Sequence, residues 1–426
     1  MTNPMTNRIA RSAGIAIAAL STLPALAGSP VDPCAPIELA AIPAQGFTRH
    51  VELVGDQLYV LDGEVLDQGW IFNGEIQELG STGLRIFDVA DPANPILIGA
   101  MPSPGRPSDI AIAGDLAFIA DGGTGGLLVV DLADPASPTI VGLAETPGLA
   151  SAIALLPVPA NNEADFRVAV ADGAEGVLIY DIFGSIPDLW RTVDTDGLAT
   201  DVVSWGSTLA VADGWNGVVF YDLDNPFRPD EIARFPVANS AVSLTHDAAN
   251  DLLYAAQAMG GVAVFDVSDP LAPVEITEYD TPGTARGIAV SGSDLYVADT
   301  YGGLHTLDAS VPPFIGIVES RDINGAPLSV ALRELDAGPI AFVAANQGGV
   351  QILNLQDCDA ACPADFAFPE GVLDLADISF FIGDFEDPTG SFPYQDNRAE
   401  GLAPPFDIAD LADITVFVNS FVAGCP

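Results

Sequence analysis

The sequence has few basic residues. Lys and Arg together number 13 against 59 Asp and Glu in 426 residues, which gives a formal net charge of −46. An acidic surface of that strength repels nucleic acid and anionic lipid, so we expect no nucleic-acid partner. The same charge suits a basic partner, cation binding, or solubility alone.

Histidine is scarce as well, and catalytic motifs are missing. The three histidines, His50, His246 and His305, lie in unlike sequence contexts. No HExxH, GxSxG or P-loop motif occurs, and no Cys/His pairing has zinc spacing. The sequence therefore indicates no catalytic residue, and nothing in it favours an enzyme.

A long apolar run is absent except near the start. There "AGIAIAALSTLPALA" (13–27) follows Arg8 and Arg11 and ends in an Ala-Leu-Ala site. This order is typical of a secretory leader, and the run is too short and too Pro-broken to span a membrane comfortably. We expect residues 1–27 to be a signal peptide with no transmembrane segment after it. The protein would then be secreted or held at the cell surface.

One unit recurs seven times along the chain. "GLRIFDVADPANP" (83–95), "GLLVVDLADPASP" (126–138) and "GVAVFDVSDP" (261–270) are its clearest copies. The aligned residues of the seven copies are Asp88, Asp131, Asp181, Asp222, Asp266, Asp308 and Asn354. Their spacing lies between 41 residues (Asp181 to Asp222) and 50 residues (Asp131 to Asp181).

Each unit contains four short runs rich in Val, Ile, Leu, Phe and Tyr, separated by Gly, Asp and Pro. Such runs predict strands, and four strands in just over forty residues predict a propeller blade. A helical repeat would need 3.6-residue periodicity, which does not occur before residue 373. We therefore predict an all-β, seven-bladed propeller over residues 28–358.

The units resemble LVIVD repeats, a family of secreted bacterial β-propeller repeats. The residues that carry the resemblance are "LRIFDVADP", "LLVVDLADP" and "VAVFDVSDP", with the "YVAD…GGL" approach at 296–304. It covers about residues 32–358. The resemblance implies a propeller and no particular activity.

The seventh unit ends without a fourth strand at "GVQILNLQDC" (349–358). Residues 32–46, "DPCAPIELAAIPAQG", match the corner and fourth strand of another unit, "DPLAPVEITEYDTPG" (269–283). We predict that this N-terminal strand completes the seventh blade and closes the ring. Cys34 and Cys358 then share one split corner, and a disulfide between them would fasten the closure.

Four aspartates recur at the end of the second strand, each shortly before a glycine: Asp121, Asp172, Asp213 and Asp299. They could form a ring of cation ligands. Asp also favours turns, because its side chain bonds nearby backbone amides, and Gln257 or Asn346 stands near this place in two units. The turn role is the simpler interpretation.

Binding in a propeller is expected where the repeat is irregular, in loops on one face. Unit one has a long insertion (63–82) with Trp70 and Phe72, and unit three has "PVPANNEADF" (157–166). Trp215 and Tyr301 occupy equivalent turns of units four and six. These aromatic residues are candidates for contacting a glycan or a protein, although they could instead pack over the blade ends.

The sequence pattern changes at Cys362, where the strand-like repeats have ended. "DLADISFFIGDF" (374–385) returns as "DLADITVFVNSF" (410–421), and each copy has an apolar stripe at helical spacing after an aspartate in the N-cap position. We predict two short helices over residues 359–426. We expect a disulfide between Cys362 and Cys425, which stand at the two ends of this module.

This duplicated pattern resembles the GC-type dockerin-like tail of some secreted bacterial proteins, among them planctomycete ones. The resemblance implies docking to a protein partner on a cell surface or matrix, and a Ca²⁺ loop that would use Asp365, Glu370, Asp374 and Asp377. The loop departs from the family pattern: it needs one extra residue after Asp365, and Ala367 or Phe368 stands where an Asn belongs. The second loop has fewer ligands still, so a metal-free helical pair is the alternative.

Together these features predict a secreted, non-catalytic binding or scaffold propeller, attached through its dockerin-like tail. One alternative is a propeller enzyme acting on extracellular glycans with carboxylates around the central channel. Three or more acidic side chains at one channel mouth would favour it, and an apolar or sealed channel would exclude it. Another alternative is a purely structural component of an envelope or matrix.

Overall fold

The computed structural model describes residues 38–63, 71–72, 75–76, 83–159, 162–223, 229–237, 239–335 and 339–355. All of them belong to one compact unit, residues 36–356. The predicted signal peptide, the predicted dockerin-like module and its proposed calcium ligands lie outside the described residues, as do all four cysteines and hence both proposed disulfides.

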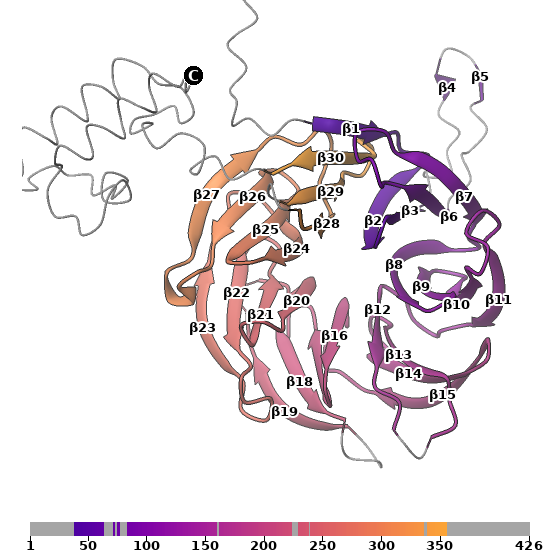
Figure 1. The fold of residues 1–426 in the computed structure, drawn as a ribbon. Helices are drawn as coiled ribbons and strands as arrows, with labels where there is room; N and C mark the ends of the chain where they lie inside the picture. Colours follow the sequence, from indigo (N-terminus) through magenta and orange to yellow (C-terminus); the bar gives the residue numbers. More distant parts are fainter. Residues whose placement is uncertain are drawn as a thin grey trace, which may run out of the picture. The chain divides into compact units, whose positions relative to one another are not determined.

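The described chain forms seven four-stranded antiparallel sheets arranged in a ring (Figure 1). The predicted all-β, seven-bladed propeller is therefore confirmed. Blades one to three are β2 (Phe47–Val54), β3 (Gln57–Gly63), β6 (Gly83–Asp88) and β7 (Ile96–Pro102); β8 (Arg106–Ala113), β9 (Leu116–Gly122), β10 (Gly126–Asp131) and β11 (Thr139–Ala144); and β12 (Ala152–Leu156), β13 (Phe166–Ala171), β14 (Val177–Phe183) and β15 (Ile186–Val193).

The remaining blades repeat this order. They are β16 (Asp201–Trp205), β17 (Thr208–Ala212), β18 (Val218–Asp222) and β19 (Asp230–Phe235); β20 (Ser243–Asp247), β21 (Leu252–Ala256), β22 (Val262–Asp266) and β23 (Val274–Tyr279); β24 (Ala285–Ser291), β25 (Asp294–Asp299), β26 (Gly303–Asp308) and β27 (Gly316–Arg321); and β28 (Ser329–Arg333), β29 (Ile340–Ala344), β30 (Val350–Asn354) and β1 (Glu38–Ile42). A short 3₁₀ helix, η1 (Pro312–Phe314), precedes β27. The insertion of blade one contains the two-residue strands β4 (Ile71–Phe72) and β5 (Glu75–Ile76).

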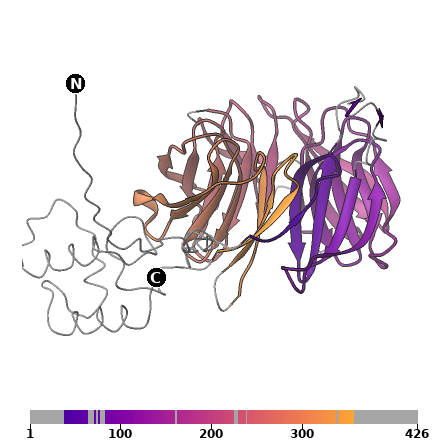
Figure 2. The ribbon, with the colours of Figure 1, turned by 90° about the horizontal axis from the view of Figure 1, so that it is seen from above.

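The ring closes as the sequence predicted. Strand β1, from the start of the chain, pairs antiparallel with β30 and supplies the fourth strand of blade seven. The inner strands contact one another in succession around the ring, and β28 of the last blade contacts β2 of the first. Figure 2 shows the ring from its edge, with the strands of each blade running across its thickness.

Apolar residues gather between neighbouring blades rather than in one central core. One cluster joins Val51 and Leu58 of blade one with Phe342 and Ile352 of blade seven. Val, Ile and Phe suit these layers because both faces of each sheet pack against another sheet. The second and third strands are almost wholly buried, whereas outer strands such as β11 alternate between exposed and half-buried residues.

The Asp-Pro corners have a local structural cause. The Asp88 carboxylate accepts a hydrogen bond from the Ala90 amide at 2.9 Å, and Asp131 accepts one from Ala133 at 2.9 Å. Side-chain bonds of this kind stabilise turns after a strand. In five of the seven units a proline follows the aligned Asp four residues later, and in blade three Ser185 stands at that place.

Candidate functional site

The recurring aspartates Asp121, Asp172, Asp213 and Asp299 are buried at the ends of the second strands. Register places Asp62 at the same position in blade one, because it lies opposite Gly83 as Asp121 lies opposite Gly126. The sequence alignment missed Asp62, since the long insertion separates it from the next strand.

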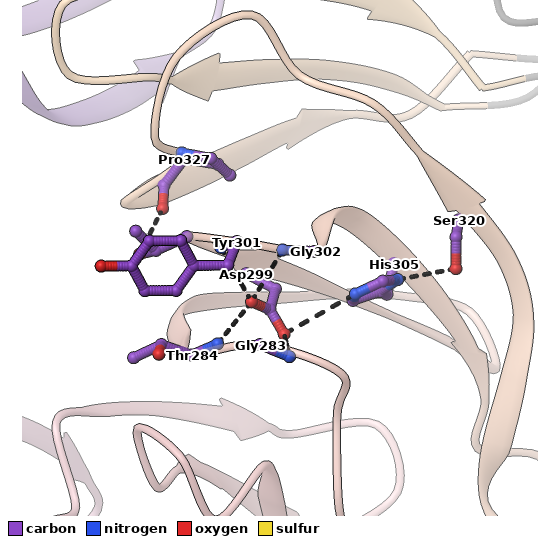
Figure 3. A network of polar contacts seen from close by, with 9 residues as sticks. Gly283, Thr284, Asp299, Tyr301, Gly302, His305, Ser320 and Pro327 are labelled. Atoms are coloured by element: carbon purple, nitrogen blue, oxygen red, sulfur yellow. Dashed lines mark hydrogen bonds and ion pairs between the residues drawn. The ribbon is translucent and has the colours of Figure 1, made fainter.

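Asp299 shows what this carboxylate does (Figure 3). Oδ2 accepts a hydrogen bond from the Gly283 amide at 2.9 Å, and Oδ1 accepts one from the Thr284 amide at 2.5 Å. The amides of Tyr301 and Gly302 also donate to Oδ1. Burial raises the pKa of the Asp299 carboxyl, but these hydrogen bonds outweigh burial and hold it below its ordinary value.

His305 is buried beside this network. Its Nε2 lies 3.6 Å from Asp299 Oδ2, and its Nδ1 lies 2.7 Å from Ser320 Oγ (Figure 3). Burial lowers the pKa of His305, so the imidazole is neutral near pH 7 and ties the third strand to the outer strand.

The other blades use the same arrangement. Asp121 accepts a hydrogen bond from the Gly105 amide at 2.8 Å, and Asp172 accepts one from the Gly148 amide at 2.7 Å. Each carboxylate thus fastens the loop that enters its blade from the preceding one. In the part of the chain that the structure describes, no group of three or more His, Cys, Asp or Glu residues suits a metal ion. The contacts favour the turn role over a cation ring.

Two residues after the buried side chains of Asp213, Gln257 and Asp299, three large side chains are exposed. Trp215, Met259 and Tyr301 are 69%, 66% and 85% exposed. They occupy the same turn, between the second and third strands, in the successive blades four, five and six. Isolated bridges from Gly214 to Ala241 and from Ala258 to Ala285 join each turn to the next blade, so the three side chains share one face of the ring.

The backbone below these side chains is firmly held. Each turn ends in a glycine with positive φ: Gly217 at 91°, Gly261 at 74° and Gly303 at 89°. A side chain there would be strained, and a Cβ on Gly303 would lie 1.9 Å from the Arg321 carbonyl oxygen. The exposed side chains therefore stand on rigid turns.

Further residues extend this exposed surface. Leu149 and Leu198, which precede the inner strands of blades three and four, are also exposed. Acidic side chains are exposed in the loops that follow the outer strands: Asp194, Asp196, Asp280 and Asp322. The sequence predicted Trp215 and Tyr301 as contact residues but not Met259, because the turn of blade five carries no aromatic residue. Trp70 lies outside the described residues, and Phe72 lies on β4, where the structure does not describe the side chains.

The inner strands place seven residues at one level of the central channel, near the end that carries these turns. Each of them pairs with the second-strand residue that comes just before the buried turn aspartate, or before the residue that replaces this aspartate in blades five and seven. The seven residues are His50, Asp109, Ala152, Asp201, Ser243, Gly287 and Ser329. All seven line an open channel of about 710 Å³.

Three of these residues are in contact. His50 Nδ1 lies 3.3 Å from Ser329 Oγ, and His50 Nε2 lies 3.2 Å from Asp109 Oδ1. The second contact lacks hydrogen-bond geometry. Burial lowers the pKa of His50. In a catalytic Ser–His–Asp arrangement the aspartate holds the histidine ring by a hydrogen bond, which the contact between Asp109 and His50 does not form in this structure.

The channel aspartates are engaged by the neighbouring blades. Asp109 Oδ2 accepts a hydrogen bond from the Ile153 amide at 2.8 Å, and Asp201 Oδ2 accepts one from the Leu244 amide at 2.7 Å. Burial raises the pKa of Asp109 to about 6. Burial, with a smaller contribution from the Asp109 charge, raises the pKa of Asp201 to about 7.

These features bear on the alternative of an enzyme. Asp109 and Asp201 share one channel level, and the third acidic lining residue, Glu52, lies two residues further along its strand. The channel is neither apolar nor sealed. The carboxylates of Asp109 and Asp201 each accept a hydrogen bond from a backbone amide of the neighbouring blade. Burial, with a smaller contribution from the Asp109 charge, raises the pKa of Glu52, so three carboxylates lie near one another in the channel, and the propeller enzyme stays an alternative prediction.

A comparison with known protein families identifies part of the repeat. The LVIVD repeat profile matches residues 80–101, 104–146, 249–281 and 282–321. These four segments match the LVIVD repeat. The matched LVIVD segments fall on blades one, two, five and six. A search of curated proteins finds no match.

Solved structures share this propeller fold at low sequence identity. Sqt1 of Saccharomyces cerevisiae is 9% identical with a TM-score of 0.56, over 74% of this chain and 98% of that one. The β-propeller domain of Cps50 (Swd1) from Myceliophteria thermophila is 13% identical with a TM-score of 0.58, over 75% and 99%. The computationally designed protein Ika8 is 10% identical with a TM-score of 0.50, over 74% and 99%. Identities this low show the fold alone. Among the described residues, no helix is long and apolar enough to cross a membrane.

Proposed function

We propose that this chain is a secreted, non-catalytic binding protein that docks a partner on the face carrying Trp215, Met259 and Tyr301. A propeller built of LVIVD repeats fits a binding or scaffold role. The observation that carries the proposal is the repetition itself: three successive blades expose a large side chain at the same turn position.

The surroundings indicate the chemistry of the partner. Trp and Tyr bind cationic groups through their ring faces, and such contacts contribute about 0.5–1 kcal/mol at exposed sites. Asp194, Asp196, Asp280 and Asp322 are exposed on the same face, and the chain has a net charge of −46. A protein surface rich in Arg and Lys complements this face in charge and in shape, because Met259 adapts to different partners.

A defined cationic probe tests this proposal. Isothermal titration of the full-length chain with an Arg- and Lys-rich peptide should give binding that weakens with added salt. The triple variant Trp215→Ser/Met259→Ser/Tyr301→Ser should weaken that binding by about tenfold or more, as expected for loss of aromatic anchors.

The matched control changes three equally exposed apolar residues elsewhere. Ile96, Ile186 and Phe314 are 64%, 68% and 82% exposed, on or beside outer strands. Their triple Ser variant should bind like the wild type. Equal loss in the two triple variants, or none in either, would show that the peptide is held by net charge and not by this face.

Attachment is the second element of the proposal. The leader-like residues 1–27 support export, and the dockerin-like pattern of residues 359–426 supports anchoring to a protein partner on a cell surface or matrix. Calcium would be held by Asp365, Glu370, Asp374 and Asp377. A calorimetric Ca²⁺ titration of the full-length chain, compared with a chain ending at residue 358, tests this element. Heat that is unchanged by the truncation would exclude a calcium site in the tail.

A further inference from the structure

Blade three differs from its neighbours at the end of the third strand. Its aligned residue, Asp181, is not followed by an Asp-Pro corner, and the two residues Gly184 and Ser185 connect β14 directly to β15. The loop before β13 is longer than its counterparts, and this is the insertion of residues 157–166 that the sequence singled out.

In place of the corner, Asp181 holds an arginine. Arg167 Nε donates to Asp181 Oδ1 at 2.6 Å, and Arg167 Nη2 donates to Oδ2 at 3.1 Å. The Arg167 guanidinium lies over the Trp190 ring, 4.0 Å from its centroid. Burial works to raise the pKa of Asp181, but the hydrogen bonds and charge of Arg167 hold it below its ordinary value. The pair is therefore ionised and fixed in orientation.

The insertion is fastened to this pair. Asn162 Nδ2 donates to Asp181 Oδ2 at 2.8 Å, and Asn162 Oδ1 accepts a hydrogen bond from the Ala164 amide at 2.9 Å. Asp165 accepts a hydrogen bond from the Gly184 amide at 2.6 Å, which joins the loop to the turn between β14 and β15. These hydrogen bonds hold the described part of the loop, residues 157–159 and 162–165, in place as one wall of a cavity.

A cavity of about 710 Å³ lies between this wall and blade four. It opens at the ends of the strands opposite to the exposed turns, so it is separate from the docking face. Its apolar lining comprises Leu156, Pro157, Val158, Pro159, Ile179, Phe183, Trp190 and Leu223, and its polar lining comprises Asn162, Glu163, Arg167 and Ser207. This volume and this mixture are typical of small-molecule sites.

We propose that this cavity binds a small uncharged molecule that combines an aromatic or alicyclic ring with a hydrogen-bond acceptor, such as an amide or ketone. Nε and Nη2 of Arg167 are bound to Asp181, which leaves Nη1 as a donor for the acceptor. The arginine is nine-tenths buried and already ordered by Trp190, so little side-chain entropy is lost when it binds. The ring packs against Phe183 and the proline-rich wall.

Charge selects against ions. Arg167 and Asp181 neutralise each other, and Glu163 is exposed at the rim. A carboxylate ligand therefore meets a negative rim on a strongly acidic chain, and an ammonium ligand offers no acceptor to Arg167 Nη1 and leaves that donor unpaired. A neutral acceptor avoids both penalties.

Three probes with one ring and different charge test this selectivity on the full-length chain: benzamide, benzoate and benzylammonium. Saturation-transfer NMR should show benzamide binding with a dissociation constant on the order of 1 mM, as expected for a fragment of this size. Benzoate and benzylammonium should bind at least about fivefold more weakly. Absence of benzamide binding, or equal binding of all three probes, would overturn the proposal.

Two variants locate the site. Ser207→Phe fills the cavity and should abolish benzamide binding, whereas Ser310→Phe places the same side chain on the exposed surface of blade six and should leave it unchanged. Should Ser207→Phe fail to fold, as judged by its melting curve, Arg167→Leu/Asp181→Leu decides instead. This double variant removes the ion pair without leaving a buried charge, so it should lose the preference for benzamide over toluene. A preference that persists would overturn the proposal.

Discussion

Ile42 lies opposite Val350 in the seventh blade. This pairing joins the beginning of the described chain to its end, so β30 has a partner strand on both sides, like the third strand of every other blade. The seventh blade exists only when the first strand has returned to it, and closure of the ring is therefore a long-range event in folding.

Removing the Ile42 side chain should destabilise the whole propeller. Ile42 is 3% exposed and packs in the cluster between blades seven and one. Ile42→Ala should lower the free energy of unfolding by about 2–5 kcal/mol, through lost burial and the cavity left behind. Urea unfolding measures this change. Val54→Ala, at a position that is 44% exposed, should change stability by less than about 0.5 kcal/mol; similar losses in both variants would contradict the role of β1.

The turn carboxylates should matter through hydrogen bonds and not through metal. Asp121→Ala leaves the Gly105 amide without its acceptor and should cost about 1–3 kcal/mol. Asp134→Ala removes an exposed acceptor of the Ala136 amide and should cost clearly less. Thermal melts with calcium and with chelator measure both changes. A loss of stability in Asp121→Ala that depends on calcium would instead support a ring of cation ligands.

Asp201 should make the stability depend on pH. Burial, with help from the Asp109 charge, raises its pKa from 3.8 to about 7. Between these values the folded chain holds a proton that the unfolded chain has lost, so this contribution is present at low pH and is lost as the pH rises through about 7. The stability of Asp201→Asn should therefore fall less than that of the wild type between about pH 5 and pH 8. Asp115→Asn, at an exposed turn, should follow the wild-type profile, and a wild-type profile for Asp201→Asn would contradict the assignment.

Two glycines with different surroundings test the spacing of the blades. A Cβ on Gly142 of blade two would lie 1.9 Å from the Ser185 carbonyl oxygen of blade three, whereas a Cβ on Gly316 would meet nothing within 4 Å. Gly142→Ala should therefore cost about 1–3 kcal/mol through overpacking. Gly316→Ala should change stability by less than about 0.5 kcal/mol. Guanidinium unfolding compares the two, and equal effects would mean that the blades are less closely packed at Gly142 than described.

Much of the fold was predictable because its information is local and repeated. The strand runs around Asp88, Asp131 and Asp266 recur with the same turns, so each copy supports the others. Ring closure was also predictable, because residues 38–42 match the fourth strand that blade seven lacks. The tail, the disulfides and the calcium ligands remain predictions, since they lie outside the described residues.

The candidate sites were harder to predict, because they depend on register between strands that are distant in sequence. Asp109, Asp201 and His50 share a channel level only because their strands align with equal offsets from the turn. Met259 becomes a candidate contact residue only because the fold places it between the exposed side chains of Trp215 and Tyr301. The contact between Arg167 and Trp190 depends on two strands of blade three, and no spacing rule would have found it.

The central claim is that the propeller is a binding protein whose working surface is the face of the exposed turns. Hydrogen–deuterium exchange of the full-length chain, with and without the bound cationic peptide, tests it most directly. The account predicts that binding slows exchange in the turns 213–217, 257–261 and 299–303 and leaves the outer strands β7, β11 and β15 unchanged. Slower exchange confined to those outer strands, or spread evenly over the ring, would contradict it.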